Sequence, residues 1–458
     1  MNDTICALAT APGGAIGIIR ISGHQALEIL SRVFQGKGDV QSYLPNTIHY
    51  GHIVEYDAVS QHHIPIDEVM VSTYRAPNSY TGEDSAEVSC HGSRYILNKV
   101  LGLLIQNGCR QANPGEFTQR AYLNGKMDLS QAEAVADLIA STNRATHQLA
   151  MSQLRGHFSD ELARLRDQLL KLTSLLELEL DFSDHEDLEF ADRGELLKLT
   201  KKIDNRIVLL ARSFETGQAI KQGIPVAIVG KTNVGKSTLL NQLLKDDRAI
   251  VSNIHGTTRD TIEDTIEIHG IVFRFIDTAG IRQTSDEVEQ IGIERTYQAI
   301  EKARIVLWII DTEPSIEDID NILQLTENKK LIVIINKIDK NGTESIPSLS
   351  SLKSPVIKIA AKYGQGIDTL EQAIYDAAQI PEITDTDIII TNARHYDALI
   401  RAHESILRVI IGMEQQLSGD LLAEDLRLTI DHLAEITGGQ ITPKEVLGNI
   451  FKNFCVGK

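Results

Sequence analysis

The chain has 458 residues, of which 42% are hydrophobic, and its formal net charge at pH 7 is −18. This length and this apolar content are enough for about three domains with cores of their own. The negative charge argues against non-specific coating of nucleic acid, but it leaves room for a local basic site for a structured RNA.

The four cysteines, Cys6, Cys90, Cys109 and Cys455, lie far apart and form no C-x-x-C pair. This spacing is typical of reduced thiols rather than of a disulfide framework or a zinc site. The N-terminus has no basic region followed by an apolar core, and the longest apolar runs have the length of strands. We therefore expect a soluble, cytoplasmic protein with no membrane partner.

Residues 1–121 predict an α+β domain. Short apolar runs at residues 16–21, 69–74 and 86–90 predict strands. Residues 24–33 and 95–105 have apolar positions at helical spacing and predict helices.

Long helices are predicted after this domain. Leucine and alanine recur every three or four residues between residues 129 and 180, and residues 195–214 continue the pattern. The acidic segment 181–192 between them predicts a solvated connector, with a metal site as the alternative. The C-terminal part is helical again, at residues 393–416, 421–436 and 443–454.

Between these helical parts the chain alternates strands and helices, which predicts a mostly parallel sheet covered on both faces. The expected strands are residues 226–229, 272–276, 305–310, 331–335 and 356–359. This nucleotide domain would be inserted into a helical body, since the ends of a domain often lie close together. The expected boundaries are 1–121 for the α+β domain, 122–216 and 382–458 for the helical domain, and 217–381 for the inserted domain.

A phosphate-binding motif follows the first of these strands. Gly230-Lys231-Thr232-Asn233-Val234-Gly235-Lys236-Ser237 has the spacing G-x-x-x-x-G-K-S and precedes a predicted helix. Glycines let the loop turn its amide groups inward, and the helix N-terminus adds partial positive charge. We expect Lys236 to reach the terminal phosphates and the Ser237 hydroxyl to hold Mg²⁺. The alternative is a glycine-rich turn that binds nothing.

Four further motifs match the GTP-binding elements of Ras-like GTPases: Gly256-Thr257-Thr258-Arg259-Asp260, Asp277-Thr278-Ala279-Gly280, Asn336-Lys337-Ile338-Asp339 and Ala360-Ala361-Lys362. A carboxylate at Asp339 can accept hydrogen bonds from the ring N–H and the exocyclic amine of guanine, which indicates GTP. Thr258 is expected to bind Mg²⁺ directly and Asp277 through water, with the amide of Gly280 at the γ-phosphate.

The glutamine that orients water in many Ras-like proteins is absent, because Ile281 follows Gly280. Glu287 and Glu289 are the nearest carboxylates, and either could instead be a solvated surface charge. Asn233 could be a turn residue, or its side chain could help bind a cation beside the phosphates.

Several segments outside these motifs resemble the bacterial tRNA-modifying GTPase family MnmE, also called TrmE, over essentially the whole chain. They are Ala9-Thr10-Ala11-Pro12-Gly13, Gly17-Ile18-Ile19-Arg20-Ile21-Ser22-Gly23, Ser79-Tyr80-Thr81-Gly82-Glu83-Asp84, Pro114-Gly115-Glu116-Phe117-Thr118, Leu129-Ser130-Gln131-Ala132-Glu133-Ala134-Val135 and Phe454-Cys455-Val456-Gly457-Lys458. One loop, Ala11-Pro12-Gly13-Gly14-Ala15, is a residue shorter than the common form of the family and lacks its basic residue.

The resemblance implies a multidomain α/β plus all-α fold: an N-terminal tetrahydrofolate-binding α+β domain that dimerises, a helical domain, and an inserted Ras-like G domain. It implies a homodimer that works with an FAD-containing flavoprotein, MnmG, as a hetero-oligomer. Together they would modify the wobble uridine of certain tRNAs at carbon 5, with folate as the one-carbon source. GTP hydrolysis would need K⁺ and the meeting of two G domains. The alternative is a regulatory GTP switch with no part in modification chemistry.

The resemblance also implies roles for single residues. Asn233, Ser252, Ile254 and Thr257 would bind K⁺, and Glu289 would orient the attacking water. Arg20, Glu87, Lys126 and Lys458 would contact folate, and Cys455 would take part in the modification. The GTP site would comprise Asn233, Val234, Gly235, Lys236, Ser237, Thr238, Ser252, Asn253, Ile254, His255, Gly256, Thr257, Thr258, Asp277, Thr278, Ala279, Gly280, Asn336, Lys337, Asp339, Ala360, Ala361 and Lys362. From the residues alone, Arg20 and Lys126 could be a strand-end charge and a turn lysine, and Cys455 a buried thiol.

Overall fold

The computed structural model describes residues 3–57, 59, 61–181, 193–245, 264–276, 297–341, 346–349, 352–381, 384, 387–439, 444–452, 454 and 457. The chain forms two compact units. The first comprises Met1–Ala140, Gln153–Asp204 and Arg401–Lys458, and the second comprises Ser141–Ser152 and Asn205–Ile400. Two long helices, α7 (Arg193–Gln222) and α14 (Ala393–Glu414), therefore contribute residues to both units.

The N-terminal part of the first unit is built on a seven-stranded sheet with the order β3-β4-β5-β6-β2-β1-β7. All neighbours are antiparallel except β1 and β7, which are parallel. The strands are β1 (Ile5–Leu8), β2 (Ile16–Ser22), β3 (Phe34–Gly36), β4 (Thr47–Asp57), β5 (His62–Tyr74), β6 (Ser85–His91) and β7 (Arg110–Gln111).

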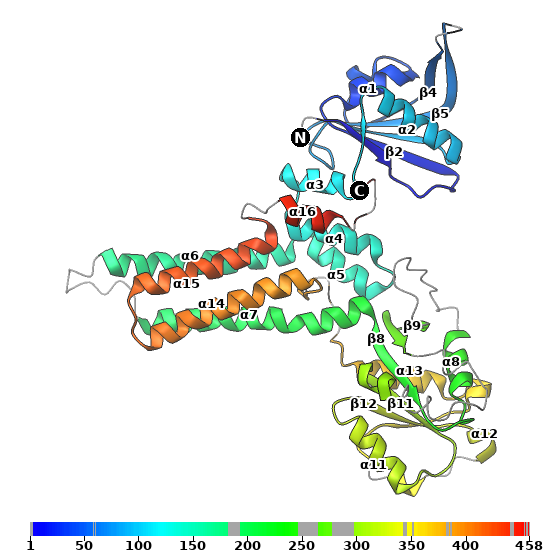
Figure 1. Cartoon of the computed structure of the whole chain (residues 1–458), viewed down its shortest axis with the longest axis vertical. Coiled ribbons are helices and arrows are strands. Elements are labelled where there is room, and N and C mark those ends of the chain that lie inside the picture. The colour runs from blue at the N-terminus through cyan, green and yellow to red at the C-terminus, as the bar shows by residue number, and fades with distance from the viewer. Residues whose placement is uncertain are drawn as a thin grey trace. The chain divides into compact units, whose positions relative to one another are not determined.

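One face of this sheet carries the core, because side chains alternate across a strand. Ile19, Ile21, Val69, Val71 and Val88 are buried in one cluster with the apolar sides of α1 (Ala26–Val33) and α2 (Arg94–Gln106). These two helices lie against the sheet in Figure 1. A short 3₁₀ helix, η1 (Val40–Ser42), follows β3 in the chain.

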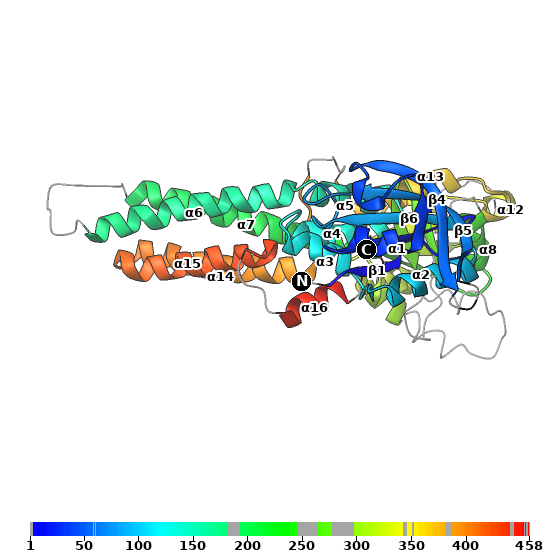
Figure 2. The same cartoon turned by 90° about the horizontal axis from the view of Figure 1, so that it is seen from above.

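The rest of the first unit is helical. Figure 2 shows α6, α7, α14 and α15 running alongside one another as a bundle. The leucines of α6 at positions 162, 165, 169, 172 and 176 are buried, as their helical spacing predicts. The helices of this part besides α7 and α14 are α3 (Glu116–Leu123), α4 (Leu129–Ala140), α6 (His157–Asp181), α15 (Gly419–Thr437) and α16 (Lys444–Phe451).

The second unit is built on a six-stranded sheet with the order β13-β12-β11-β8-β10-β9. All its pairs are parallel except the edge pair β9–β10. Its strands are β8 (Ile224–Val229), β9 (Asp264–Ile268), β10 (Ile271–Phe275), β11 (Ile305–Ile310), β12 (Lys330–Ile335) and β13 (Val356–Lys358). Its short helices are α5 (Arg144–Leu154), α8 (Lys236–Lys245), α11 (Ile316–Leu325), α12 (Ile338–Asn341), α13 (Ile367–Ala378), η2 (Pro347–Leu349) and η3 (Ala361–Tyr363).

Helix α5 belongs to the core of this second unit. Ala145 and Leu149 of α5 are buried in one cluster with the residues of β8, β9 and β10. The Ala145 amide donates to the carbonyl oxygen of Gly270 at 3.3 Å, in the turn between β9 and β10. His269 and Gly270 both have positive φ, at 51° and 83°, as a two-residue hairpin turn of this kind requires.

All the strands and helices predicted above among the described residues are found. Several elements were not predicted, among them the strands β1, β3, β4, β7 and β9 and the helix α3. The packing of α5 on the sheet of the second unit was not predicted either. The acidic segment 182–192 lies outside the described residues. In the part of the chain that the structure describes, no helix is both long and apolar enough to cross a bilayer.

A buried charge network ties α3 to the strands of the first unit. The Arg120 side chain is 1% exposed, and its Nη2 donates to Asp3 Oδ1 at 2.8 Å and to Glu116 Oε1 at 3.0 Å. Its Nη1 lies 3.2 Å from Glu83 Oε1. Burial by itself would raise the pKa of Glu116, but hydrogen bonds from Arg110, Arg120 and the Asn113 amide hold that pKa below 4.5.

A carboxylate with a lowered pKa stabilises the fold above its unfolded pKa, and this contribution is lost as the pH falls through the folded value. We therefore expect protection of the α3 amides against hydrogen exchange to fall below about pH 4.5, by at most about 1.4 kcal/mol per pH unit for Glu116. The Glu116→Gln variant should show a flatter dependence, whereas Glu28→Gln, in an exposed pair with Arg32, should behave as the parent chain does. Equal slopes in all three proteins would contradict the assignment.

Candidate functional site

The phosphate motif forms a tight loop between β8 and α8. Gly230 and Gly235 have φ values of +152° and +104°, which favour glycine. A Cβ at Gly230 would lie 2.3 Å from the carbonyl oxygen of Ile309, and one at Gly235 would lie 2.3 Å from Asn336 Nδ2. Both glycines are therefore required by close neighbours as well as by their backbone conformation.

Lys236 begins α8, and its side chain folds back over this loop. Its Nζ donates to the carbonyl oxygens of Gly230 at 2.6 Å and Lys231 at 2.8 Å. Burial lowers the pKa of Lys236. Ser237 is half-buried on the next position, and Thr238 is exposed. The ammonium group thus lies at the loop and at a helix N-terminus, where an anion is favoured.

The side-chain amide of Asn336 joins three loops. Asn336 is 3% exposed, and its Nδ2 donates to the Val234 carbonyl oxygen at 2.8 Å. Its Oδ1 accepts from the Ala361 amide at 3.0 Å. The phosphate loop, the loop after β12 and the loop after β13 are therefore held together by one buried side chain.

Lys337 makes a second link from the loop after β12 to the phosphate loop, and it also reaches Asp311 at the end of β11. Its Nζ donates to the Asn233 carbonyl oxygen and to Asp311 Oδ2, both at 2.7 Å. Asp339 is exposed on α12. The structure thus brings the phosphate motif, Asn336, Lys337 and Asp339 to one edge of the sheet. The last of the expected motifs lies beside them, with Ala360 and Ala361 buried and Lys362 exposed.

Asn233 is exposed at the rim of the phosphate loop with a φ of +61°. Asparagine tolerates this left-handed conformation, so the geometry is compatible both with a turn residue and with a cation ligand. The other expected residues of this site lie outside the described residues: Ser252, Asn253, Ile254, His255, Gly256, Thr257, Thr258, Asp277, Thr278, Ala279, Gly280 and Glu289.

A second candidate site surrounds Arg20 in the first unit. Arg20 of β2 and Glu87 of β6 are direct partners across the sheet, and Arg20 Nε donates to Glu87 Oε1 at 2.9 Å. The guanidinium carbon lies 5.6 Å from the ring centre of Tyr80 and 5.7 Å from that of Phe117. Phe117 is fully buried, so of the two rings only Tyr80, which is 39% exposed, is open to a flat, polar ligand beside Arg20.

The C-terminal segment also reaches this site. Arg20 Nη1 donates to the carbonyl oxygen of Gly457 at 3.2 Å. Gly457 has a φ of +95°, and a Cβ there would lie 2.3 Å from the carbonyl oxygen of Leu8 at the end of β1. Lys126 is exposed and donates to the Pro77 carbonyl oxygen at 3.0 Å. Cys455 and Lys458 lie outside the described residues.

Sequence reasoning assigned no role to Tyr80, Phe117 or Gly457. Each lies in a segment that carries the family resemblance, but nothing in the chain order places their groups beside Arg20. Contacts between residues 437 positions apart, as for Arg20 and Gly457, have no local signal.

The sheet face opposite α1 and α2 exposes apolar side chains. Ile16 and Ile48 are each 64% exposed, Tyr50 is 57% exposed and Met70 is 45% exposed. Tyr50 and Met70 are direct partners between β4 and β5. Arg20 and Glu87 lie on this same face. Arg20 pairs with Glu87 between β2 and β6, Glu87 pairs with Ser72 between β6 and β5, and Ser72 pairs with the exposed Ile48 of β4.

Family models and curated proteins match the chain throughout. A model described as the GTP-binding protein TrmE N-terminus matches residues 4–126, and one for the MnmE helical domain matches residues 129–455. A tRNA modification GTPase MnmE of Phocaeicola vulgatus is 54% identical over 498 aligned residues, which cover 100% of this chain and 99% of the relative. The protein of the same name from Bacteroides fragilis is 54% identical over 472 aligned residues and is covered, like this chain, to 100%.

A solved structure that resembles part of the chain is that of Era. Era, in a crystal structure with MgGDPNP and nucleotides of 16S ribosomal RNA, is 32% identical over 39% of this chain and 65% of its own, with a TM-score of 0.25. The family matches and the two sheets confirm the expected fold class: an N-terminal α+β domain, a helical domain, and an α/β domain with a phosphate loop.

Replacing Asn336 by alanine should weaken nucleotide binding, because the Val234 carbonyl and the Ala361 amide lose their partner. An unpaired buried group costs about 1–3 kcal/mol, so we expect at least about fivefold weaker binding of a fluorescent GTP analogue. The matched control is Asn321→Ala on the exposed side of α11, and fluorescence of Trp308 reports whether the β11 core is intact. Unchanged affinity in a folded Asn336→Ala variant would contradict the role given to this side chain.

Proposed function

Because the chain belongs to the MnmE family of tRNA modification GTPases, we propose that it hydrolyses GTP to drive modification of tRNA at carbon 5 of the wobble uridine. The observation that supports this most directly is the glycine-lined phosphate loop, joined through Asn336 to the loop that carries Asp339. A tRNA substrate would place this work in the cytoplasm, and FAD would enter only through an MnmG-like partner protein.

The loop residues fit a nucleoside triphosphate with Mg²⁺. The Lys236 ammonium group now bonded to two loop carbonyls would move to the β- and γ-phosphate oxygens, which accept more strongly because they are charged. The Ser237 hydroxyl is an oxygen ligand of the kind that Mg²⁺ takes, and Thr258 would be the second. Mg²⁺, when bound, neutralises charge on the phosphates. Asp339 would select guanine, and Asp277 and Gly280 would sense the γ-phosphate.

Asn233 would supply one K⁺ ligand, together with Ser252, Ile254 and Thr257, and Glu289 would orient the attacking water through a second water. The exposed position of Asn233 at the loop rim supports this role, since a cation there would lie beside the phosphates. Two G domains of a homodimer would meet across this site during hydrolysis.

The steady-state GTPase rate should therefore be higher in KCl than in NaCl at equal ionic strength. Asn233→Ala should lose the advantage of K⁺ while it still binds GTP, because the loop glycines and Lys236 are unchanged. Equal rates of the parent chain in both salts would rule out cation-assisted hydrolysis and leave the nucleotide assignment in place.

Arg20 and Glu87, with Lys126 and Lys458, would bind a tetrahydrofolate derivative as the one-carbon donor. The exposed Tyr80 ring beside Arg20 supports a flat heterocyclic ligand. Cys455 would act in the modification chemistry. The remaining cysteines are buried free thiols, and burial raises the pKa of Cys90 to about 12, which makes a poor nucleophile.

Homodimerisation would use the open sheet face of the N-terminal domain. Its exposed apolar side chains form a surface that a second copy could cover, since exposed apolar patches often mark interaction sites. Because Arg20 and Glu87 lie on that face, the folate site would border the dimer interface.

Arg20→Gln should weaken binding of a stable tetrahydrofolate derivative by about tenfold or more, because a hydrogen bond to a charged group is worth about 1.5–3 kcal/mol. The matched control, Arg32→Gln, changes an exposed arginine of α1 and should leave folate affinity unchanged. Isothermal titration on the full chain gives both values. Folate binding that is indifferent to Arg20 would contradict the site, and intact binding of a GTP analogue would show that the chain is folded.

A further inference from the structure

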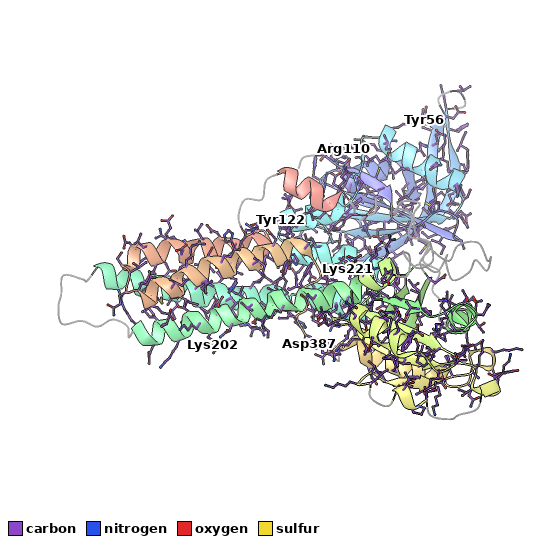
Figure 3. The ribbon with its side chains drawn as sticks, turned by 60° about the horizontal axis from the view of Figure 1, so that its bottom comes forward. Tyr56, Arg110, Tyr122, Lys202, Lys221 and Asp387 are labelled. Carbon is purple, nitrogen blue, oxygen red and sulfur yellow. The ribbon has the colours of Figure 1, made fainter. Side chains whose placement is uncertain are left out.

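The solvent-facing side of helix α7 carries a row of basic residues. Lys198, Lys201 and Lys202 are exposed within about one turn of the helix. At 3.6 residues per turn, these three side chains fall within a sector of about 100°. In Figure 3, Lys202 lies on the side of α7 that faces away from α14 and α15.

The opposite side of α7 is the one that packs. Leu196, Thr200 and Ile203 are buried at three- and four-residue spacing. The Asp204 side chain is 14% exposed, and its Oδ1 lies 2.5 Å from His403 Nδ1 of α14. This carboxylate is therefore turned inward and partnered, whereas Glu195, one turn before Lys198, is exposed and leaves the row with a net positive charge.

The helix α15 in the same bundle has the opposite charge. It carries one cation and five carboxylates: Arg427, and Asp420, Glu424, Asp425, Asp431 and Glu435. Its cation is taken up in an ion pair with Glu177 at 2.7 Å. A chain with a net charge of −18 thus keeps a concentrated basic face on α7.

We propose that this basic face of α7 is a docking surface for the phosphate backbone of tRNA. The inference rests on the tRNA substrate of the proposed function and adds the part of the chain that receives it. Lysine ammonium groups bind phosphates as point charges. Lys198 and Lys202 are one turn apart, about 6 Å along the helix axis, so each can meet its own phosphate.

Lys201 can join them at little cost. It lies 2.7 Å from Glu414, but both side chains are about half exposed, at 48% and 49%. An exposed ion pair of this kind contributes little to stability. A phosphate can replace the carboxylate, whereas the packed residues of α7 need not move.

The test compares two double variants of the full chain. Lys198→Gln with Lys202→Gln removes two charges from the basic face. Lys171→Gln with Arg427→Gln removes two exposed charges from α6 and α15 and is the matched control. Binding of unmodified tRNA is measured by fluorescence anisotropy over a range of KCl concentrations, beside the GTPase rate.

We expect the α7 variant to bind tRNA more weakly and the slope of log K against log[KCl] to decrease in magnitude by between about 1 and 2, since each phosphate contact contributes about one unit. Its GTPase rate and the slope of the control variant should equal those of the parent chain. An unchanged slope in the α7 variant, or an equal change in the control, would overturn the docking surface.

Two other outcomes are informative. If the parent chain binds no tRNA at any salt concentration, the tRNA part of the proposed function fails, and the docking surface fails with it. If the α7 variant binds tRNA as the parent does but loses binding of the flavoprotein partner, the basic face receives an acidic protein surface instead of RNA, and the proposal is wrong.

Discussion

The nucleotide-binding half of the molecule depends on one buried amide. Asn336 donates to the phosphate loop and accepts from the loop after β13, so that the two loops take their positions from the same side chain. This is possible because β8, β11, β12 and β13 are parallel and end at one edge of the sheet. Lys337 repeats the link with a charge, through Asp311. The phosphate loop and the loop after β12 are separated by over a hundred residues in the chain, yet these hydrogen bonds hold them together without a ligand.

The Arg20 site is held by a comparable but ionic arrangement. Arg120 binds Glu83 in the loop that carries Tyr80, and it binds Glu116 on the helix that carries Phe117. The two rings that flank Arg20 thus come from segments joined by a single buried guanidinium. A buried guanidinium without carboxylate partners is costly, so Arg120 favours the one arrangement in which both segments contact it. Both regions share a principle: a buried polar side chain determines the relative positions of segments that are far apart in the chain.

The parallel strands of the nucleotide domain could be predicted because they are continuous apolar runs between glycine-rich or polar turns. The phosphate loop could be predicted because its glycines and lysine are neighbours in the chain. Strand β4 could not, since only Gly51, Ile53 and Val54 of its eleven residues are buried and its pattern is mainly polar. The contact of Arg20 with Gly457 could not be predicted either, because it depends on how the C-terminal segment packs against the N-terminal sheet. The spacing of Ala145 and Leu149 predicts that α5 buries one of its sides. It does not predict which part of the chain that side packs against.

The packing of α5 determines where the nucleotide domain can be separated from the rest of the chain. In sequence, α5 belongs to the helical stretch, and more than sixty residues separate it from the first strand of the sheet that it covers. A segment beginning at β8 would therefore leave behind the part of its core that Ala145 and Leu149 supply, although α8 and α13 would still contact β9. The folding unit of the nucleotide domain thus begins at α5 and not at its first strand.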